Sequence, residues 1–195
     1  MTAGLRERKK AATRLALHQA AVRLALEQGV DRVTVEAIAD EVGVSRRTFS
    51  NYFANKEQAL LYGDYERMGR LLAAVRDRPA GEPAWAALTG AAEDLYRDLG
   101  DLDPEVVLRW RLMRKSPALN AQHVNTFAGL ERELSAEIAA RSPDRDPMGV
   151  RARLTAAAFM TALRVALDVW LDQPSGVRLA DVVSRTLAEA GRGFA

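Results

Sequence analysis

The sequence predicts an all-α protein, and three observations support this class. Apolar residues recur at spacings of three and four along most of the chain, which is the period of an α-helix. The periodic segments are separated by proline or glycine, with no strand pattern and no repeat among them. With 195 residues, 48% of them hydrophobic, the chain can form one large or two small cores. We therefore expect about nine helices, with a three-helix domain over residues 1–55 and a larger helical domain over residues 56–195.

The first expected helix runs from Lys9 to Gln28, after a flexible segment over residues 1–8. Gly29 ends it, and its buried face consists of Leu17, Ala20, Ala21 and Leu24. Basic residues gather at its start, namely Arg6, Lys9, Lys10 and Arg14. A basic arm of this kind could reach a DNA phosphate or a minor groove, although a solvated tail explains the run from Arg6 to Lys10 equally well.

Two shorter helices follow, and the turn between them is the most informative part of the chain. Thr34 is an N-cap candidate for the first of them, and Gly43 supplies the positive φ that ends it. Ser45 is an N-cap candidate for the second, in which Phe49 and Phe53 can face inward. This spacing is that of a helix-turn-helix, whose second helix enters the major groove with its N-terminal end first.

The outward side of the second short helix begins with two adjacent arginines, Arg46 and Arg47. An arginine can pair with guanine through two hydrogen bonds or neutralise a phosphate. Ser50, one turn along the same face, is small enough to let the helix lie deep in a groove. The alternative is an ordinary helical hairpin whose charged end is solvated.

A block from Leu17 to Lys56 matches a known family at many positions without a gap. The matching residues are Leu17, Ala20-Ala21, Leu24, Gly29, Thr34-Val35, Ile38-Ala39, Gly43-Val44-Ser45, Thr48-Phe49, Asn51-Tyr52-Phe53 and Asn55-Lys56-Glu57. This block, about a quarter of the chain, resembles the DNA-binding domain of the TetR family of one-component regulators. Ala25 and Val30 depart from the resemblance, because the family usually has an aromatic residue at these positions.

The resemblance implies a double-stranded DNA operator as partner and a role for each matching residue. Arg46, Arg47 and Ser50 would read bases. The phosphate contacts would come from Thr34, Thr48, Tyr52 and Lys56. The complete predicted DNA-contacting set is Thr34, Ser45, Arg46, Arg47, Thr48, Ser50, Asn51, Tyr52 and Lys56.

Charge is distributed unevenly along the chain. Residues 1–56 contain ten Lys or Arg against six Asp or Glu, a net charge of +4, so the remainder carries 18 minus 20, or −2. A basic N-terminal part on a slightly acidic body is typical of a nucleic-acid-binding domain joined to a ligand domain. Cysteine is absent, and the longest apolar run, residues 154–163, is about half a membrane span. The expected compartment is the cytoplasm, with no membrane association.

The rest of the chain is predicted to be helical. A long fourth helix is expected from Lys56 to about Arg78, and the resemblance implies that it connects the DNA-binding and ligand-binding parts. A linker over residues 76–83 contains Pro79, Gly81 and Pro83. The later helices are expected over residues 83–99, 103–115, 117–141, 147–171 and 177–190.

Apolar and aromatic residues in the middle helices exceed what a narrow packing seam needs. They favour a hydrophobic effector cavity, with ordinary core packing as the alternative. The predicted effector-binding residues are Tyr65, Met68, Trp85, Leu88, Tyr96, Trp110, Met113, His123 and Phe127. A basic cluster, Arg109, Arg111, Arg114 and Lys115, is either an exposed face or an anion subsite. The second reading fits an effector such as a fatty acid or an acyl-CoA, which some members of the resembled family bind.

The last two helices carry apolar stripes that can pack within the chain or against a second copy. Two recognition helices one DNA turn apart would read a palindrome, and the resemblance implies a four-helix bundle between subunits. A homodimer is therefore expected. The predicted dimerisation residues are Leu154, Ala158, Thr161, Val165, Val169, Val183 and Leu187.

An enzyme is disfavoured, because the sequence has no Gly-x-Ser-x-Gly elbow, Gly-rich phosphate loop or His-Glu-x-x-His helix. The acidic run of Glu131, Glu133 and Glu137 is better explained as a solvated face than as a metal site, and no cofactor is expected. A helical protein-interaction scaffold without sequence-specific DNA binding is the alternative function. The preferred function is a homodimeric, ligand-responsive transcriptional repressor that binds a palindromic operator and is released by a small, largely apolar effector.

Overall fold

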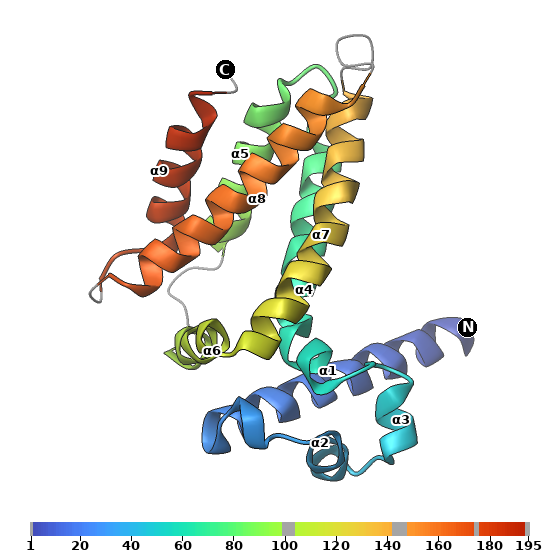
Figure 1. Ribbon diagram of the computed structural model, residues 1–195. Coiled ribbons are helices and arrows are strands. Elements are labelled where there is room, and N and C mark those ends of the chain that lie inside the picture. The colour runs from blue at the N-terminus through green and yellow to red at the C-terminus, as the bar shows by residue number, and fades with distance from the viewer. Residues whose placement is uncertain (1, 99–103, 142–147, 174–175, 194–195) are drawn as a thin grey trace. The chain divides into compact units, whose positions relative to one another are not determined.

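The computed structural model describes residues 2–98, 104–141, 148–173 and 176–193, and every element in these ranges is helical. The α-helices, shown in Figure 1, are α1 (Thr2–Gln28), α2 (Val35–Val42), α3 (Arg46–Ser50), α4 (Lys56–Asp77), α5 (Ala84–Asp98), α6 (Pro104–Lys115), α7 (Pro117–Ala140), α8 (Val150–Leu171) and α9 (Leu179–Gly191). A 3₁₀-helix, η1 (Val30–Arg32), lies between α1 and α2. The predicted all-α class is confirmed.

The chain divides into two compact units. The N-terminal unit consists of Met1–Glu66 and Pro104–Val124, and the C-terminal unit of Arg67–Asp103 and Asn125–Ala195. Helices α4 and α7 therefore contribute residues to both units. The predicted boundary before Lys56 coincides with the first residue of α4 and stays a prediction.

The core of the N-terminal unit forms where the apolar faces of α1, α2 and α4 meet the residues around α3. Leu17, Ile38, Phe49 and Leu60 are all fully buried there. The ring of His18 adds a polar tie, because its Nδ1 lies 2.8 Å from the backbone oxygen of Ala59 on α4. This core holds the two short helices in place although neither is long enough to be stable alone.

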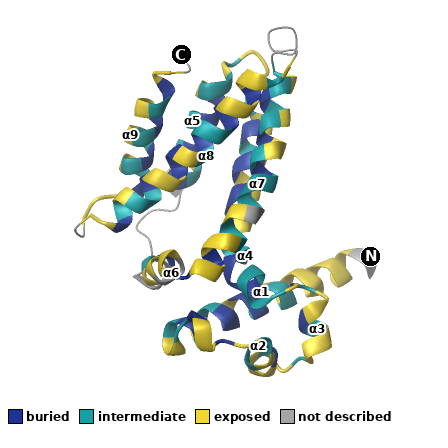
Figure 2. Cartoon of the chain, in the orientation of Figure 1, coloured by how far each residue is buried: buried dark blue, intermediate teal, exposed yellow. Residues whose placement is uncertain are grey.

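Helix α1 begins seven residues earlier than predicted, at Thr2 and not at Lys9. Alanine, arginine, lysine and glutamate dominate its first turns, and these residues have high helix propensity. The Arg8 Nε also donates to the Gly4 carbonyl, 3.2 Å away, one turn back. Figure 2 shows that this first part of α1 is exposed, whereas its second half carries the buried residues.

In the C-terminal unit, α9 packs on α5 and α8. Leu88 of α5, Phe159 of α8 and Leu187 of α9 are fully buried in this core. Trp85 lies edge-on to Phe159, with 6.1 Å between ring centroids, and its indole also contacts Gly191 at the end of α9. Any side chain at position 191 would collide with the Trp85 indole, so only glycine fits at the end of α9.

Candidate functional site

Two side-chain caps and one glycine build the helix-turn-helix from local sequence. Thr34 Oγ1 accepts a hydrogen bond from the Ala37 amide, 3.1 Å away, at the start of α2. Gly43 ends α2 in the left-handed region with φ 72°. Ser45 Oγ then accepts from the amide of Thr48, 3.0 Å away, at the start of α3. The angle between the two helices is thus fixed by contacts among neighbouring residues.

Helix α3 is anchored on one side and exposed on the other. Its Phe49 is buried and lies 5.8 Å, between ring centroids, from Phe53. With this side held inward, the side chains of Arg46, Arg47 and Ser50 are exposed on the opposite side. The arrangement presents two guanidinium groups at the first turn of a short helix, as DNA reading in a major groove requires.

The other predicted DNA-contacting residues surround α3. Thr34, Ser45 and Asn51 are exposed, whereas Thr48 and Tyr52 are half-buried. The hydroxyls of Ser45 and Thr48 also form a hydrogen bond with each other at 2.9 Å, which uses part of their hydrogen-bonding capacity. Except for Lys56, the predicted DNA-contacting residues therefore lie on or near one short helix with an exposed side.

Arg46 and Arg47 differ in their partners. Arg46 Nη1 lies 2.9 Å from Glu36 Oε1 of α2, with both side chains more than half exposed. Such a pair contributes about 0–1 kcal/mol, so a DNA phosphate or base can replace Glu36 at little cost. Arg47 forms no ion pair with any residue in the described ranges. It is therefore immediately available to a ligand.

Lys56 has a different place from the one predicted. Its Nζ donates to the backbone oxygens of Val33 at 2.8 Å, Val30 at 3.0 Å and Asp31 at 3.4 Å. The ammonium group thus caps the carbonyl end of η1, and all three of its protons have acceptors inside the protein. We therefore remove Lys56 from the expected phosphate contacts and assign it a structural role.

A cluster of Arg14, Phe53 and Tyr62, which was not predicted from the sequence, lies next to the end of α3. The guanidinium carbon of Arg14 lies 6.0 Å from the centroid of the Phe53 ring and 5.8 Å from that of Tyr62. Burial raises the pKa of the Tyr62 hydroxyl, the charge of Glu66 raises it further, and Arg14 opposes both. Arg14 was predicted as part of the basic arm, but its position one turn before Leu17 on the buried face of α1 was the available signal.

The predicted effector residues do not gather in one unit. Tyr65, Trp110 and His123 belong to the N-terminal unit, whereas the C-terminal unit holds Met68, Trp85, Leu88, Tyr96 and Phe127. Met113 has a side chain outside the described residues. Trp85 and Leu88 pack in the core between α5, α8 and α9, which agrees with the core alternative for these two residues.

One buried polar contact lies among these residues. Trp110 Nε1 donates to Asp64 Oδ1 at 3.1 Å, and both residues are buried in the N-terminal unit. Asp64 was not predicted as a site residue. Its spacing of four from both Leu60 and Met68, on the apolar face of α4, was the signal that it would be buried.

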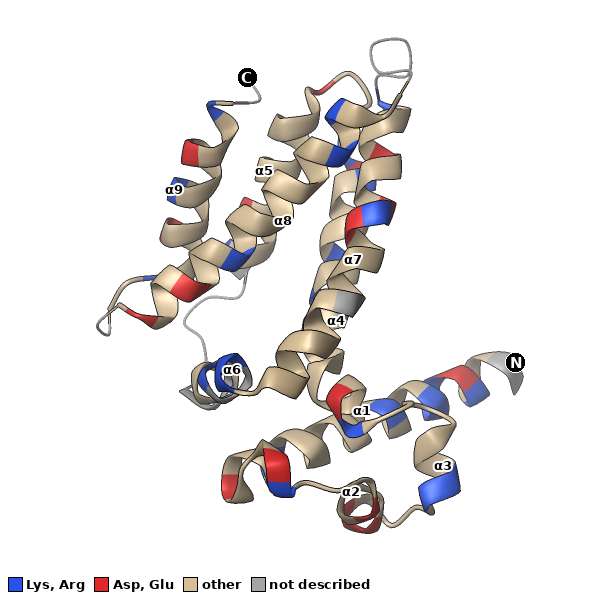
Figure 3. Cartoon of the chain, viewed as in Figure 1, with Lys and Arg blue, Asp and Glu red and all other residues tan. Residues whose placement is uncertain are grey.

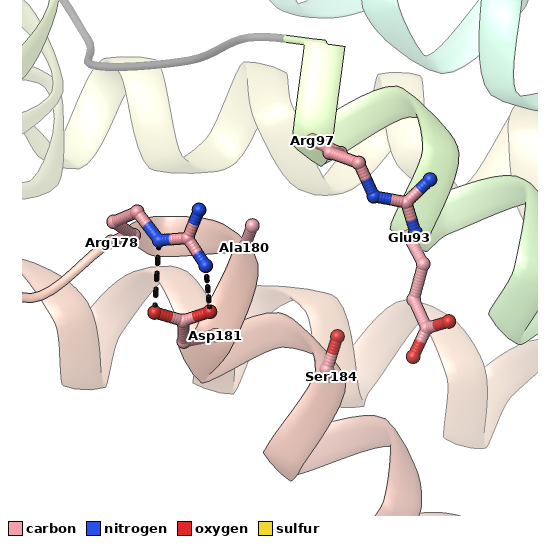
Figure 4. Close-up of a pocket in the computed structure, with 6 residues that line it drawn as sticks. All are labelled: Glu93, Arg97, Arg178, Ala180, Asp181 and Ser184. Carbon is pink, nitrogen blue, oxygen red and sulfur yellow. Dashed lines mark hydrogen bonds and ion pairs between the residues drawn. The ribbon is translucent and has the colours of Figure 1, made fainter.

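A hollow of about 260 Å³ in the C-terminal unit has a different character from the predicted cavity. Figure 4 shows that its side chains come from α5 and from the start of α9: Glu93, Arg97, Arg178, Ala180, Asp181 and Ser184. Arg178 is paired with Asp181, and Arg97 with Asp94. The hollow is therefore lined by charged groups that largely neutralise one another, and it contains none of the predicted effector residues.

The predicted dimerisation residues separate into two groups. Leu154, Thr161, Val165 and Val169 of α8 are exposed, and Ala158 is half-buried. By contrast, Val183 and Leu187 of α9 are 1% and 0% exposed, because they pack inside their own chain. These two residues are therefore withdrawn from the association surface.

Comparisons with known proteins agree with this geometry. The family described as "Bacterial regulatory proteins, tetR family" matches residues 17–62, and the "MftR C-terminal domain" matches residues 82–195. The chain is 35% identical over 173 residues to the HTH-type transcriptional regulator TcmR of Streptomyces glaucescens, a match that covers 86% of this chain and 76% of that protein.

Two solved structures share the fold at lower identity. Thermus thermophilus FadR, a TetR-family repressor in complex with lauroyl-CoA, has a TM-score of 0.61 and 22% identity, covering 93% of this chain and 95% of its own. SmeT, the repressor of the Stenotrophomonas maltophilia efflux pump SmeDEF, has a TM-score of 0.63 and 18% identity, covering 92% and 89%. This chain therefore belongs to the TetR family: it is a ligand-responsive DNA-binding transcriptional regulator and not an enzyme.

Proposed function

We propose that the protein is a cytoplasmic repressor that binds a palindromic operator as a homodimer and leaves it when a small, largely apolar effector binds. The observation that supports DNA reading best is the pair of exposed arginines at the start of α3, backed by the buried Phe49. A scaffold that binds only protein gives no reason for two guanidinium groups at the first turn of a helix-turn-helix.

In the proposed complex, Arg46, Arg47 and Ser50 contact base edges. Arg47 can do so without losing a partner, whereas Arg46 exchanges Glu36 for the DNA. Thr34, Thr48 and Tyr52 contact phosphates around α3 and fix its register without reading sequence. The Thr34 hydroxyl only accepts in its capping bond, so its proton can be donated to a phosphate oxygen, and the Thr48 proton is available in the same way when Ser45 donates the bond between their hydroxyls.

The homodimer is proposed to form through the exposed face of α8. Leu154, Val165 and Val169 place apolar side chains on this face, and Ala158 and Thr161 between them are small enough for a second helix to approach closely. A twofold pairing presents two α3 helices, so the operator is proposed to have two half-sites about 34–36 Å, one DNA turn, apart.

The effector is proposed to be an acyl chain carrying an anionic group, a fatty acid or an acyl-CoA. Supporting this class, Thermus thermophilus FadR is described with lauroyl-CoA and Bacillus subtilis FadR with stearoyl-CoA. On this chain, Arg111, Arg114 and Lys115 of α6 are exposed and could meet the anionic group. Ligand binding is proposed to shift α4, which contributes to both units, with a coupling of about 1–3 kcal/mol.

The experiment begins with duplexes selected from a random-sequence pool by the purified protein. We expect a palindromic consensus, and Arg47→Ala should lose about 1–3 kcal/mol at one base pair of each half-site. Arg192→Ala, which removes an exposed arginine from the C-terminal unit, is the matched control and should bind like the wild type. Absence of any consensus would support the scaffold alternative.

The effector and the direction of regulation need separate measurements. Lauroyl-CoA, lauric acid and coenzyme A are added in parallel to the selected duplex, and the first two are expected to weaken binding about 5–150-fold. Unchanged affinity with all three would reject this effector class. Transcripts next to the operator should rise when the gene is deleted, and a fall would identify an activator.

A further inference from the structure

We propose that the first turns of α1 form a rigid basic arm whose Arg6, Lys9 and Lys10 hold DNA backbone phosphates beside the bases contacted by α3. This inference rests on the proposed DNA-binding function and adds a second contact surface to it. The partner is the sugar–phosphate backbone of a DNA duplex, and the contact is independent of base sequence.

Several cations of residues 1–56 are held by other groups of the protein, whereas within the described residues those of the arm are not. Arg14 lies on two aromatic rings and Lys56 on backbone carbonyls. Arg23 is paired with Glu41 at 2.6 Å, and Arg46 is paired with Glu36. In the described residues, the arm side chains Arg6, Lys9 and Lys10 form neither ion pairs nor hydrogen bonds and are exposed. Figure 3 shows the resulting run of Lys and Arg along the first half of α1, with Asp and Glu on α2.

These three cations lie on one face of α1. Arg6, Lys9 and Lys10 are spaced at i, i+3 and i+4, which is the spacing of neighbours on a helix surface. Arg8 is two residues from Arg6 and therefore points to another side of the helix, where it bonds the Gly4 carbonyl. The only acidic residue between positions 2 and 26, Glu7, is three residues before Lys10 and borders this face at that one position.

The basic face of the arm is aligned with the buried face of α1. Leu17 is seven residues after Lys10 and eleven after Arg6, which is close to two and three whole turns. Leu17 is fully buried on the face of α1 that packs into the core. In the second half of α1 this face carries buried apolar residues. In the first turns, which extend beyond the core, the same face carries the cations of the arm.

The arm leaves the domain next to the recognition helix. Its base is Arg14, whose guanidinium lies over Phe53, three residues after the end of α3. From Arg14 to Arg6 the helix extends by about 12 Å at 1.5 Å per residue, which is about the width of the major groove. With α3 in that groove, the arm is long enough to reach phosphates along its edge.

The test compares Arg6→Gln/Lys9→Gln/Lys10→Gln with the wild type on a random-sequence duplex and on the duplex selected by the wild type. Each lost phosphate contact lowers the slope of log K against log salt by roughly 0.9, so the triple variant should lose about 2.7 per bound subunit, or about 5.4 per homodimer. At about 0.15 M salt this corresponds to roughly 100-fold weaker binding of both duplexes per bound subunit, since the contribution vanishes near 1 M. Glutamine keeps a high helix propensity, and circular dichroism verifies that α1 remains helical.

The matched control is Arg8→Gln, which removes one charge from the same arm but from another side. We expect its salt slope to equal that of the wild type. A triple variant whose salt slope equals that of the wild type overturns the inference. The inference also fails if Arg8→Gln lowers the slope by one third of the decrease seen in the triple variant, because each cation of the arm would then contribute equally, whichever side of the helix it is on. If the wild type selects no consensus sequence, the proposed regulator function fails, and the random-sequence duplex still tests the arm. If the wild type binds neither duplex, both the proposed function and the proposed arm are wrong.

Discussion

Helix α9 buries its apolar residues inside its own chain, whereas α8 buries one apolar face and exposes another. On α9, Leu179, Val183 and Leu187 are buried against α5 and α8. On α8, Phe159 and Ala162 are buried in the same core, yet Leu154 is 58% and Val165 36% exposed. A helix with one apolar face needs one packing partner, and a helix with two needs a second partner.

The composition of α8 agrees with this two-sided character. An 18-residue window within Val150–Leu171 reaches a mean hydropathy of 1.5, so among the described residues this helix is long and apolar enough, by length and composition alone, to cross a membrane. This exceeds the half span expected from the apolar run at residues 154–163. Exposed Arg164 lies away from both ends of this helix, where an arginine in a bilayer would cost about 2.5–3.5 kcal/mol, so the exposed face suits a protein partner better than lipid. In the proposed homodimer, a second copy of α8 would be such a partner.

The largest expected effect on stability comes from creating a cavity in the core around α9. Leu187→Ala removes a fully buried side chain and should lower the free energy of unfolding by about 2–5 kcal/mol. Leu154→Ala removes the same atoms from an exposed site of α8, so its effect on the isolated subunit should stay below about 0.5 kcal/mol. Urea unfolding at protein concentrations low enough to dissociate a dimer measures both. Equal losses would remove the contrast between the helices.

The next effect concerns the exposed side of α8. Leu154→Glu/Val165→Glu places like charges on both sides of a twofold contact and should raise the dimer dissociation constant at least about 100-fold, or roughly 2.7 kcal/mol. Sedimentation velocity measures the change, and circular dichroism should show an intact fold. Arg185→Glu, on the exposed side of α9, is the control and should leave the association unchanged. A double variant that remains dimeric would move the interface to another surface.

The difference between α8 and α9 also shows what the sequence could predict. Both stripes were visible as helical periodicity, but periodicity indicates that a face is buried and does not identify what buries it. Val183 and Leu187 were therefore assigned to the dimer together with Leu154, although their partners lie within the chain. Only the three-dimensional packing of α5 beside α9 separates the two cases.

Local features were predictable and long-range ones were not. Thr34, Gly43 and Ser45 cap or end their helices as expected, because each acts on residues three or four positions away. Lys56 acts on carbonyls 23 to 26 residues away, and Arg14 on rings 39 and 48 residues away. No pattern along the chain brings such partners together, and these two cations were consequently assigned to DNA.

The smallest expected effect concerns a half-buried ion pair that lies within one chain. Arg78 Nε donates to Glu82 Oε2 at 2.7 Å in the C-terminal unit, and this hydrogen bond lowers the pKa of Glu82. A carboxylate whose pKa is lower in the folded state stabilises the fold above its unfolded pKa, and this stabilisation disappears as the pH falls through the folded value. The free energy of unfolding of the Glu82→Gln variant should therefore fall slightly less than that of the wild type when the pH is lowered from neutral to about 3. Urea unfolding across that range, at subunit concentrations too low for dimers, is the measurement. Because the pair is entirely within one chain, the difference should be independent of protein concentration, unlike any effect at the exposed face of α8.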